Sequence, residues 1–415
     1  MQFTHSTRKS CRLCSCTSLE RVVKLPDTVP GEHLKNRINE EDPIILPISL
    51  YQCEECCHVQ LNTIPDPLSL FNDSYTFMPG NNPMVVKHFS NTIDYFVDTF
   101  KSSISFTFEI GSNDGLFLDL LMKKTRCKTL GIDPAYPTVK VARERGIDTI
   151  HDFFIPGSEV SIQGKYGRPD LIVANNVFAH IDDLQGIVRS IHNLLEDDGY
   201  FIFEASYLLD IVNKYLIGTI IHEHLSHHSV YSIRPFLCSF GLSLIDILRV
   251  DNIQGGAIIG VAKKSDDRNS NDQINMLIEE EIESGITSTE GMHSFNDRLH
   301  SKLLNFKNKI LELSDKNQII VYGAARSAPF ILQLLEIGDR ISCVIDDNPE
   351  KIGKYLPIFN IPIYGSDYLR KYSSSHQYFF LIAGWAQTTR ILKILRSNYN
   401  GKAASIYPSF QVEDL

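Results

Sequence analysis

Short apolar segments alternate with amphipathic segments along the middle of this chain. Strand-like apolar runs occupy residues 104–110, 128–132, 149–154, 170–174 and 200–204, and helical periodicity marks residues 84–100, 116–122, 139–146 and 184–195. An apolar strand followed by a helix is typical of βα units, which form a parallel sheet with right-handed crossovers. We therefore expect an α/β domain here, built on a parallel sheet.

A second βα series begins near residue 318, after a polar and acidic stretch at residues 265–300. Strands are expected at residues 318–322, 341–345 and 378–382, with a helix at residues 329–336. The pattern predicts a second Rossmann-like domain, but its turn, residues 323–328, lacks the glycine triad that binds a pyrophosphate. This domain either has a structural or dimer-forming role or cradles a nucleotide sugar, with Arg326 near a phosphate.

The segment 108–115 joins the first strand of the middle series to its first helix. Gly111 and Gly115 allow a tight turn there, and such a turn is where a doubly wound sheet binds a nucleotide-type ligand. Turns of this composition also simply connect a strand to a helix. Asp133 ends the next strand, 22 residues past Gly111, where an acid accepts hydrogen bonds from ribose hydroxyls in dinucleotide folds.

Three details favour S-adenosylmethionine over a nicotinamide dinucleotide as that ligand. The turn reads Gly-x-x-x-Gly, which suits a ligand without a pyrophosphate. Glu109 stands two residues before the first glycine, where a carboxylate can face an amino group. The fourth strand ends in the polar pair Asn175 and Asn176 rather than in a dehydrogenase pattern.

The first seventy residues contain six of the nine cysteines. Two Cys-x-x-Cys pairs, separated by 38 residues, are typical of the two knuckles of a tetrahedral zinc site. The expected ligands are Cys11, Cys14, Cys53 and Cys56. Unliganded cysteines or a redox pair are the alternatives, and Cys16, Cys57 and His58 are spare candidates. A site with four thiolates is coordinatively closed, so we expect the zinc to be structural.

Composition narrows the class of protein. The 415 residues carry a net charge of −10 without a basic block, which argues against nucleic acid as a partner. No apolar run approaches the roughly 20 residues of a membrane span, and the N-terminus has no apolar core of a signal peptide. We expect a cytoplasmic protein without a membrane partner. A monomer and a homodimer both remain open.

Four of the 14 histidines lie within residues 222–228. His222 and His224 are spaced i, i+2, unlike the i, i+4 spacing of a helical zinc site. A polar surface loop would explain the cluster without any chemistry. We prefer general-base chemistry, in which a neutral histidine takes a proton and the neighbouring carboxylate of Glu223 orients it.

Taken together, these segments resemble the sugar C-methyltransferase family, which acts on nucleotide-linked 4-keto-deoxy sugars. The resemblance spans nearly the whole chain and is carried by the two Cys-x-x-Cys pairs and by residues 109–115, 131–134, 175–180, 222–224 and 351–357. It implies a class I methyltransferase core with Rossmann-like topology at residues 73–265. A small zinc-binding domain would precede it at residues 1–72, and a Rossmann-like C-terminal domain would follow at residues 266–415.

The resemblance also implies roles for individual residues. The cofactor-binding residues would be Glu109, Gly111, Asn113, Asp114, Gly115, Asp133, Pro134, Phe153, Asn175, Asn176 and His180. His224 would be the base that removes the proton next to the ketone, with Glu223 as its partner and His222 beside them. Tyr75 would lie over the sugar as a hydrogen-bond donor. The resulting enolate carbon would attack the methyl group of S-adenosylmethionine.

The chain departs from the family pattern on the acceptor side. The tyrosine that usually precedes His-Glu-His is Ile221, which cannot donate a hydrogen bond, and the following Tyr-x-Ser is reduced to His228 and Ser229. His-Gly-Gly-Ser-x-Arg is reduced to residues 254–259, and a Lys-Gly pair becomes Arg326 and Ser327. The methyl donor is therefore a firmer expectation than the acceptor. O- or N-methylation of a sugar or related small molecule, and a non-catalytic cofactor-binding subunit, are the competing hypotheses.

Overall fold

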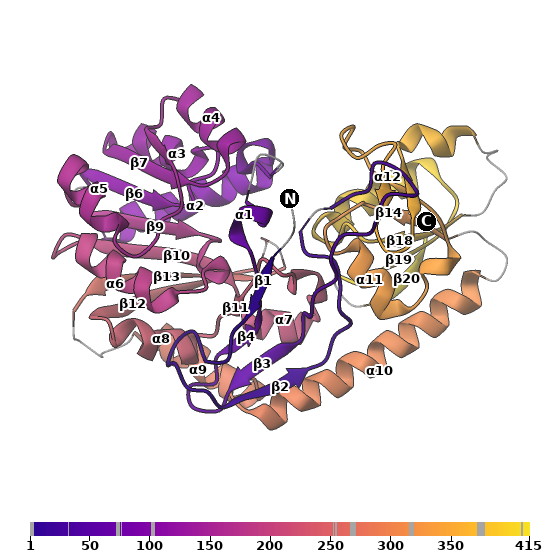
Figure 1. The fold of residues 1–415 in the computed structure, drawn as a ribbon, viewed down its shortest axis with the longest axis horizontal. Coiled ribbons are helices and arrows are strands. Elements are labelled where there is room, and N and C mark those ends of the chain that lie inside the picture. Colours follow the sequence, from indigo (N-terminus) through magenta and orange to yellow (C-terminus); the bar gives the residue numbers. More distant parts are fainter. Residues whose placement is uncertain are drawn as a thin grey trace.

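The computed structural model describes residues 4–31, 33–71, 75, 77–100, 104–251, 253, 255–265, 271–314, 319–371, 378–407 and 410–415. Gln254, the first residue of the Gly-Gly segment, and Gln318, at the start of the second strand series, lie outside these ranges. Figure 1 shows two α/β bodies side by side, joined along one edge by N-terminal strands and the long helix α10. None of the described helices is long and apolar enough to cross a membrane.

The central sheet has seven strands in the order β12-β13-β10-β9-β6-β7-β8. Its parallel part comprises β6 (Phe106–Ile110), β7 (Lys128–Asp133), β8 (Thr149–His151), β9 (Leu171–Asn175) and β10 (Tyr200–Ser206). The five strands of the predicted βα series are parallel as expected, and an antiparallel pair extends the sheet at one edge. Strand β13 (Ala257–Lys264) runs antiparallel to both β10 and β12 (Leu242–Val250), because β12 and β13 form a hairpin instead of another βα unit.

Both faces of this sheet are buried, which is why its strands are apolar at nearly every position. Along β9, Leu171 and Val173 pack on one face with α2 and α3, while Ile172 and Ala174 pack on the other face with α5 and α6. The helices of this domain are α2 (Pro83–Phe100), α3 (Leu116–Thr125), α4 (Tyr136–Glu144), α5 (Ser158–Tyr166), α6 (Leu184–Leu194), α7 (Leu208–Lys214) and α8 (Val230–Cys238). The carboxyl ends of the parallel strands therefore meet at one edge, where ligands bind in such folds.

The N-terminal strands form two small sheets, and the larger of them takes one strand from the central region. Strands β2 (Leu19–Val23), β3 (Leu50–Cys53) and β4 (Val59–Leu61) are completed by β11 (Ser226–His227), which comes from the histidine-rich segment. Strand β1 (His5–Thr7) pairs with β5 (Thr63–Pro65), and the short helix α1 (Pro67–Leu70) follows. The zinc-binding region is thus joined by backbone hydrogen bonds to the segment that follows His224.

The C-terminal sheet has the order β16-β17-β15-β14-β18-β19-β20. The parallel strands are β14 (Ile319–Tyr322), β15 (Ile341–Ile345), β17 (Ile361–Tyr364), β18 (Tyr378–Ile382) and β19 (Gly401–Ser405), with β16 (Tyr355–Leu356) and β20 (Gln411–Asp414) antiparallel at the edges. Its helices are α11 (Ala328–Leu335) and α12 (Thr388–Asn398). Helices α9 (Asp272–Ser284) and α10 (Thr289–Ser314) precede it, and α9 packs on α8 and β12 of the central domain.

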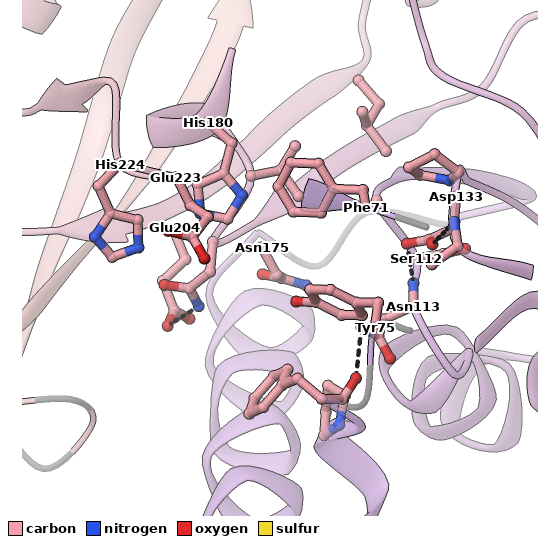
Figure 2. A pocket seen from close by; sticks show the side chains of 18 of the residues that line it. Phe71, Tyr75, Ser112, Asn113, Asp133, Asn175, His180, Glu204, Glu223 and His224 are labelled. Atoms are coloured by element: carbon pink, nitrogen blue, oxygen red, sulfur yellow. Dashed lines mark hydrogen bonds between the residues drawn. The ribbon is translucent and has the colours of Figure 1, made fainter. Parts of the chain in front are cut away.

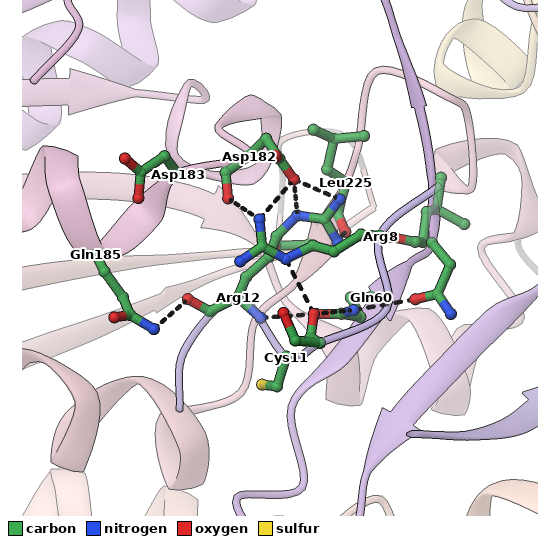
Figure 3. A network of polar contacts seen from close by, with 12 residues as sticks. Arg8, Cys11, Arg12, Gln60, Asp182, Asp183, Gln185 and Leu225 are labelled. Carbon is green, nitrogen blue, oxygen red and sulfur yellow. Dashed lines mark hydrogen bonds and ion pairs between the residues drawn. The ribbon is translucent and has the colours of Figure 1, made fainter. Parts of the chain in front are cut away.

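A buried arginine joins the first cysteine knuckle to the central domain (Figure 3). Arg12 is fully buried, and its guanidinium donates to the carbonyl oxygens of Leu61 and Leu225 and lies 3.0 Å from a carboxylate oxygen of Asp182. Burial lowers the pKa of Arg12 to about 10, while Asp182 opposes that shift. Gln185 adds a hydrogen bond to the carbonyl of Leu13. One side chain therefore fixes two segments of the central domain relative to the knuckle.

We expect Arg12→Met to lower the free energy of unfolding by roughly 3 kcal/mol, because the buried carbonyl of Leu61 loses its donor, and the carbonyl of Leu225 and the carboxylate of Asp182 each lose one of two partners. Arg21→Met, at an exposed arginine of β2, serves as the matched control and should change the free energy of unfolding by less than about 0.5 kcal/mol. Urea unfolding monitored by circular dichroism measures both. Equal effects of the two substitutions would contradict the role assigned to Arg12.

Candidate functional site

A cavity of about 780 Å³ lies at the carboxyl ends of the parallel strands and is closed on one side by the C-terminal domain. Figure 2 shows the side chains that line it. The sequence-predicted residues among them are Tyr75, Glu109, Gly111, Asn113, Asp114, Asp133, Pro134, Phe153, Asn175, Asn176, His180, Glu223 and His224. Of the predicted catalytic and cofactor-binding residues, Gly115 and His222 do not line this cavity.

The turn between β6 and α3 has the left-handed conformations that its glycines permit. Gly111 has φ +67°, and a Cβ there would lie 2.3 Å from a methyl carbon of Val177, so both conformation and space require glycine. Gly115 has φ +73° and caps α3, which explains its place outside the cavity. The backbone N–H of Asn113 donates to Asp133 at 2.9 Å and fixes the turn against the end of β7.

Glu109 and Asn175 form a buried pair at the tips of β6 and β9. The amide nitrogen of Asn175 donates to Oε1 of Glu109 at 2.9 Å. The other carboxylate oxygen of Glu109 and the amide oxygen of Asn175 are buried without a hydrogen-bond partner among the described residues. Burial raises the pKa of Glu109 well above its ordinary value, although the bond from Asn175 opposes this. Two acceptors without donors favour a ligand that brings donors, such as an ammonium group.

The acids of the turn region differ in how they are already bonded. Asp133 accepts from the backbone N–H groups of Asn113 and Ala135 and from the hydroxyl of Thr138, and its burial raises its pKa. Asp114 accepts from the backbone of Gly80 and pairs with Arg145 at 2.9 Å. Asp114 therefore also anchors the segment that covers the turn.

His224 has a geometry that suits a general base. Its Nδ1 lies 2.6 Å from the carbonyl oxygen of Thr219, so Nδ1 carries the proton and donates. Nε2 of the neutral ring is then an acceptor, which is the form that removes a proton. Enclosure in the cavity lowers the pKa of His224, with Glu223 acting in the opposite direction. The ring stacks on His180 with centroids 5.2 Å apart, and His180 stacks in turn on Phe71.

Glu223 does not orient His224 in the way the sequence predicts, because the carbonyl of Thr219 holds Nδ1 instead. The carboxylate of Glu223 is buried and pairs with Arg326 of the C-terminal domain at 3.1 Å. The same guanidinium lies 5.2 Å from the ring centre of Tyr75. The influence of Glu223 on His224 is therefore electrostatic, and the C-terminal domain contributes a cation to the cavity.

His222 points away from the cavity. Its Nε2 lies 3.2 Å from each of the carbonyl oxygens of Leu46 and Pro47, in the N-terminal region. This contact fixes the segment before His224 and leaves His222 no part in proton transfer. Ile221 lines the cavity and adds an apolar side chain to its wall.

Sequence reasoning missed several residues of the cavity. His88 and Glu204 are both buried, line the cavity and lie 2.6 Å apart, between Nε2 and Oε2. Phe71 and Trp385 also line it. Glu204 stands within β10 near its carboxyl end, as Asn175 does in β9, and an acid at that position was the available signal. His88 is on a helix that precedes the sheet, and its place in the site has no local signature.

The four cysteines of the two knuckles meet as expected. The sulfur atoms of Cys11, Cys14, Cys53 and Cys56 lie within 4.8 Å of one another. Four thiolates in one cluster fit a tetrahedral zinc ion and leave no open coordination position. Within the part of the chain that the structure describes, no other group of three or more His, Cys, Asp or Glu side chains meets the same criterion. The site is structural and holds the knuckle that carries Arg12.

Comparison with known proteins assigns the three regions in the same order. A zinc-binding domain model matches residues 11–71, a methyltransferase domain model matches residues 91–246, and a C-methyltransferase C-terminal domain model matches residues 252–408. The chain therefore carries a methyltransferase domain between a zinc-binding domain and a C-methyltransferase C-terminal domain. Among curated proteins, the chain is 25% identical to the C-methyltransferase NovU of Streptomyces niveus over 388 residues, which is 92% of this chain and 91% of NovU.

Solved structures overlap this chain only in part. Magnesium protoporphyrin IX methyltransferase of Synechocystis PCC 6803, with bound SAH, is 15% identical with a TM-score of 0.35 and covers 44% of this chain and 85% of its own. The N-methyltransferase NodS of Bradyrhizobium japonicum WM9 is 13% identical with a TM-score of 0.34 and covers 44% of this chain and 98% of its own.

The stability of this enzyme should depend on pH through His227. Its ring is buried without a hydrogen-bond partner among the described residues, and burial lowers its pKa from 6.5 to about 3. Since the unfolded chain binds this proton below pH 6.5 and the folded chain does not, stability is lost as pH falls. Between pH 7 and pH 5, we expect the free energy of unfolding of His227→Leu to fall by about 2 kcal/mol less than that of the wild type.

Urea unfolding at the two pH values measures this difference. The matched control is His300→Leu, at an exposed histidine of α10, which should lose as much stability as the wild type. An equal loss in His227→Leu and in the wild type would contradict the assignment.

Proposed function

We propose that this enzyme is an S-adenosylmethionine-dependent C-methyltransferase that methylates the carbon next to the ketone of a nucleotide-linked keto-deoxy sugar. The observation that carries the proposal is the tautomer of His224, whose Nε2 is the free acceptor of a neutral ring. A base of this kind is needed to remove a proton from carbon. The similarity to NovU over nearly the whole length of both chains supports the same class of reaction.

The donor side of the cavity fits S-adenosylmethionine by the chemistry of its side chains. Glu109 and Asn175 offer unpartnered acceptors to the ammonium group, and Asp133 stands at the end of β7 for the ribose hydroxyls. Phe153 lines the cavity after β8 and offers its ring to the adenine. When bound, the cofactor supplies a methyl group on a sulfonium, which is electrophilic without further activation.

On the acceptor side, the chain moves one proton and stabilises one charge. Nε2 of His224 takes the proton from the carbon next to the ketone, and the electron pair of that C–H bond becomes the enolate. The hydroxyl of Tyr75 and the guanidinium of Arg326 are the donors in the cavity for the enolate oxygen. One well-placed donor of this kind contributes roughly 3 kcal/mol to such a step. The enolate carbon then takes the methyl group, and a neutral thioether leaves.

The C-terminal wall supports a nucleotide-linked acceptor. Arg326 and Lys351 both line the cavity there, so the C-terminal domain contributes two cations to it. Guanidinium and ammonium groups are the usual partners of phosphate oxygens. Lys351 also donates to the carbonyl of Ala324 and thereby braces the turn that carries Arg326.

O- or N-methylation of a sugar or related small molecule is the second candidate, and Ile221 is the observation that favours it. An apolar side chain in the cavity wall cannot donate to an enolate oxygen. A hydroxyl or amine acceptor needs only a base such as His224.

The position of the transferred methyl group separates the two candidates. We expect methyl-labelled S-adenosylmethionine to give a carbon-bound methyl group with 4-keto nucleotide sugars and no product with 4-hydroxy sugars, as read by nuclear magnetic resonance of the products. His224→Ala should lower the rate at least about 100-fold, because a general base is lost, and His300→Ala should leave it unchanged. A methyl group on oxygen or nitrogen would contradict C-methylation.

A further inference from the structure

Two consecutive amides at the tip of β9 are held by two different carboxylates. The amide nitrogen of Asn175 donates to Glu109 at 2.9 Å, and that of Asn176 donates to Oε1 of Glu204 at 2.8 Å. Asn176 has φ +55°, and its backbone N–H donates to the carbonyl of Glu204 at 2.9 Å. Side chain and backbone of Asn176 are therefore both bonded to Glu204.

Glu204 is itself fixed by His88. Glu204 is fully buried, and its second oxygen lies 2.6 Å from Nε2 of His88, a buried residue of α2. One oxygen of this carboxyl group is thus engaged by a ring nitrogen and the other by an amide nitrogen. The amide of Asn176 presents its NH₂ group to Glu204, which leaves its carbonyl oxygen on the other side of the amide. The proton transfer and the cofactor contacts described above use neither His88 nor Glu204.

This arrangement determines which polar atoms the amides leave to the cavity. The NH₂ groups of Asn175 and Asn176 are each turned toward a carboxyl group, so their carbonyl oxygens remain for a ligand. Together with the unpartnered oxygen of Glu109, they give the tip of β9 several acceptor oxygens. A surface of partial negative charge in an enclosed site attracts a cation and gives a neutral group of the same shape no such attraction.

Asn176 lines the cavity next to Asn175 in the chain. In Figure 2, its neighbour Asn175 lies between the turn residues Asn113 and Asp133 on one side and the base His224 on the other. Glu204, which holds Asn176, is drawn on the side of His224. All of these residues line the same cavity. Asn176 is therefore bonded to a carboxylate drawn near His224 and follows Asn175, which is drawn between His224 and the turn.

We propose that Glu204 and His88 are positioning residues that hold the Asn176 oxygen toward the positively charged sulfonium of the methyl donor. The cavity then binds S-adenosylmethionine in preference to the neutral thioether S-adenosylhomocysteine, so the product of transfer is released more readily than the cofactor. This inference rests on the proposed function, since it assumes S-adenosylmethionine as the donor. Both ligands carry the same ammonium group, so Glu109 and Asn175 contribute equally to the two and the preference arises at Asn176.

The ratio of the two dissociation constants tests the proposal. In Glu204→Gln, the new side chain accepts from His88 with its oxygen and offers its NH₂ group to Asn176, whose amide must then turn its own NH₂ group into the cavity. We expect the ratio of the dissociation constant of S-adenosylmethionine to that of S-adenosylhomocysteine to rise about tenfold, as measured by isothermal titration calorimetry. Asn176→Gly removes the oxygen and suits the positive φ, and it should raise the ratio similarly.

A matched control and a double variant complete the test. Glu281→Gln alters another fully buried carboxylate, one that accepts from the backbone at the start of α8 away from the cavity, and should leave the ratio unchanged. Glu204→Gln should have no further effect on the ratio in the Asn176→Gly background. An unchanged ratio in both single variants, or an equal weakening of both ligands, would overturn the positioning role. A wild type that binds neither ligand would instead contradict the proposed function.

Discussion

The buried guanidinium of Arg12 is the contact on which the geometry of the site depends. It stands between two zinc ligands, Cys11 and Cys14, and bonds to the carbonyl of Leu225 and to Asp182. Leu225 follows His224 directly in the chain, and Asp182 lies two residues after His180. A zinc ion that is coordinatively closed, and so without chemistry of its own, thereby fixes both rings of the stacked histidine pair.

The segment before His224 is held from three directions. His222 bonds to the N-terminal region, and Glu223 pairs with Arg326 of the C-terminal domain. Gly218 lies so close to Trp385 that a Cβ would come within 2.2 Å of the indole nitrogen. Thr219 is thus placed to accept from His224 and to set its tautomer. All three domains therefore contribute contacts that position His224, and the proposed role as a general base needs such preorganisation.

The sequence predicted those parts of the site that depend on local pattern. The turn at Gly111, the acid at Asp133 and the four knuckle cysteines follow from spacing along short segments. In the structure, Gly111 and Asp133 line one cavity, and the four cysteines form a separate cluster. The partners of Glu223 and Glu204 are 103 and 116 residues away in the chain, and no periodicity records such pairs. The hairpin of β12 and β13 was missed for a related reason, because an apolar run does not disclose the direction of its strand.

The central claim is that His224 removes a proton from the carbon next to a ketone. The most direct measurement is exchange of that proton with deuterated solvent when S-adenosylhomocysteine occupies the donor side and no methyl transfer follows. The account predicts that a 4-keto nucleotide sugar gains deuterium at this carbon with the wild type. With a His224→Ala variant that still binds S-adenosylhomocysteine, it predicts no gain above the uncatalysed rate. Exchange that persists in the variant, or none with the wild type, would contradict the account.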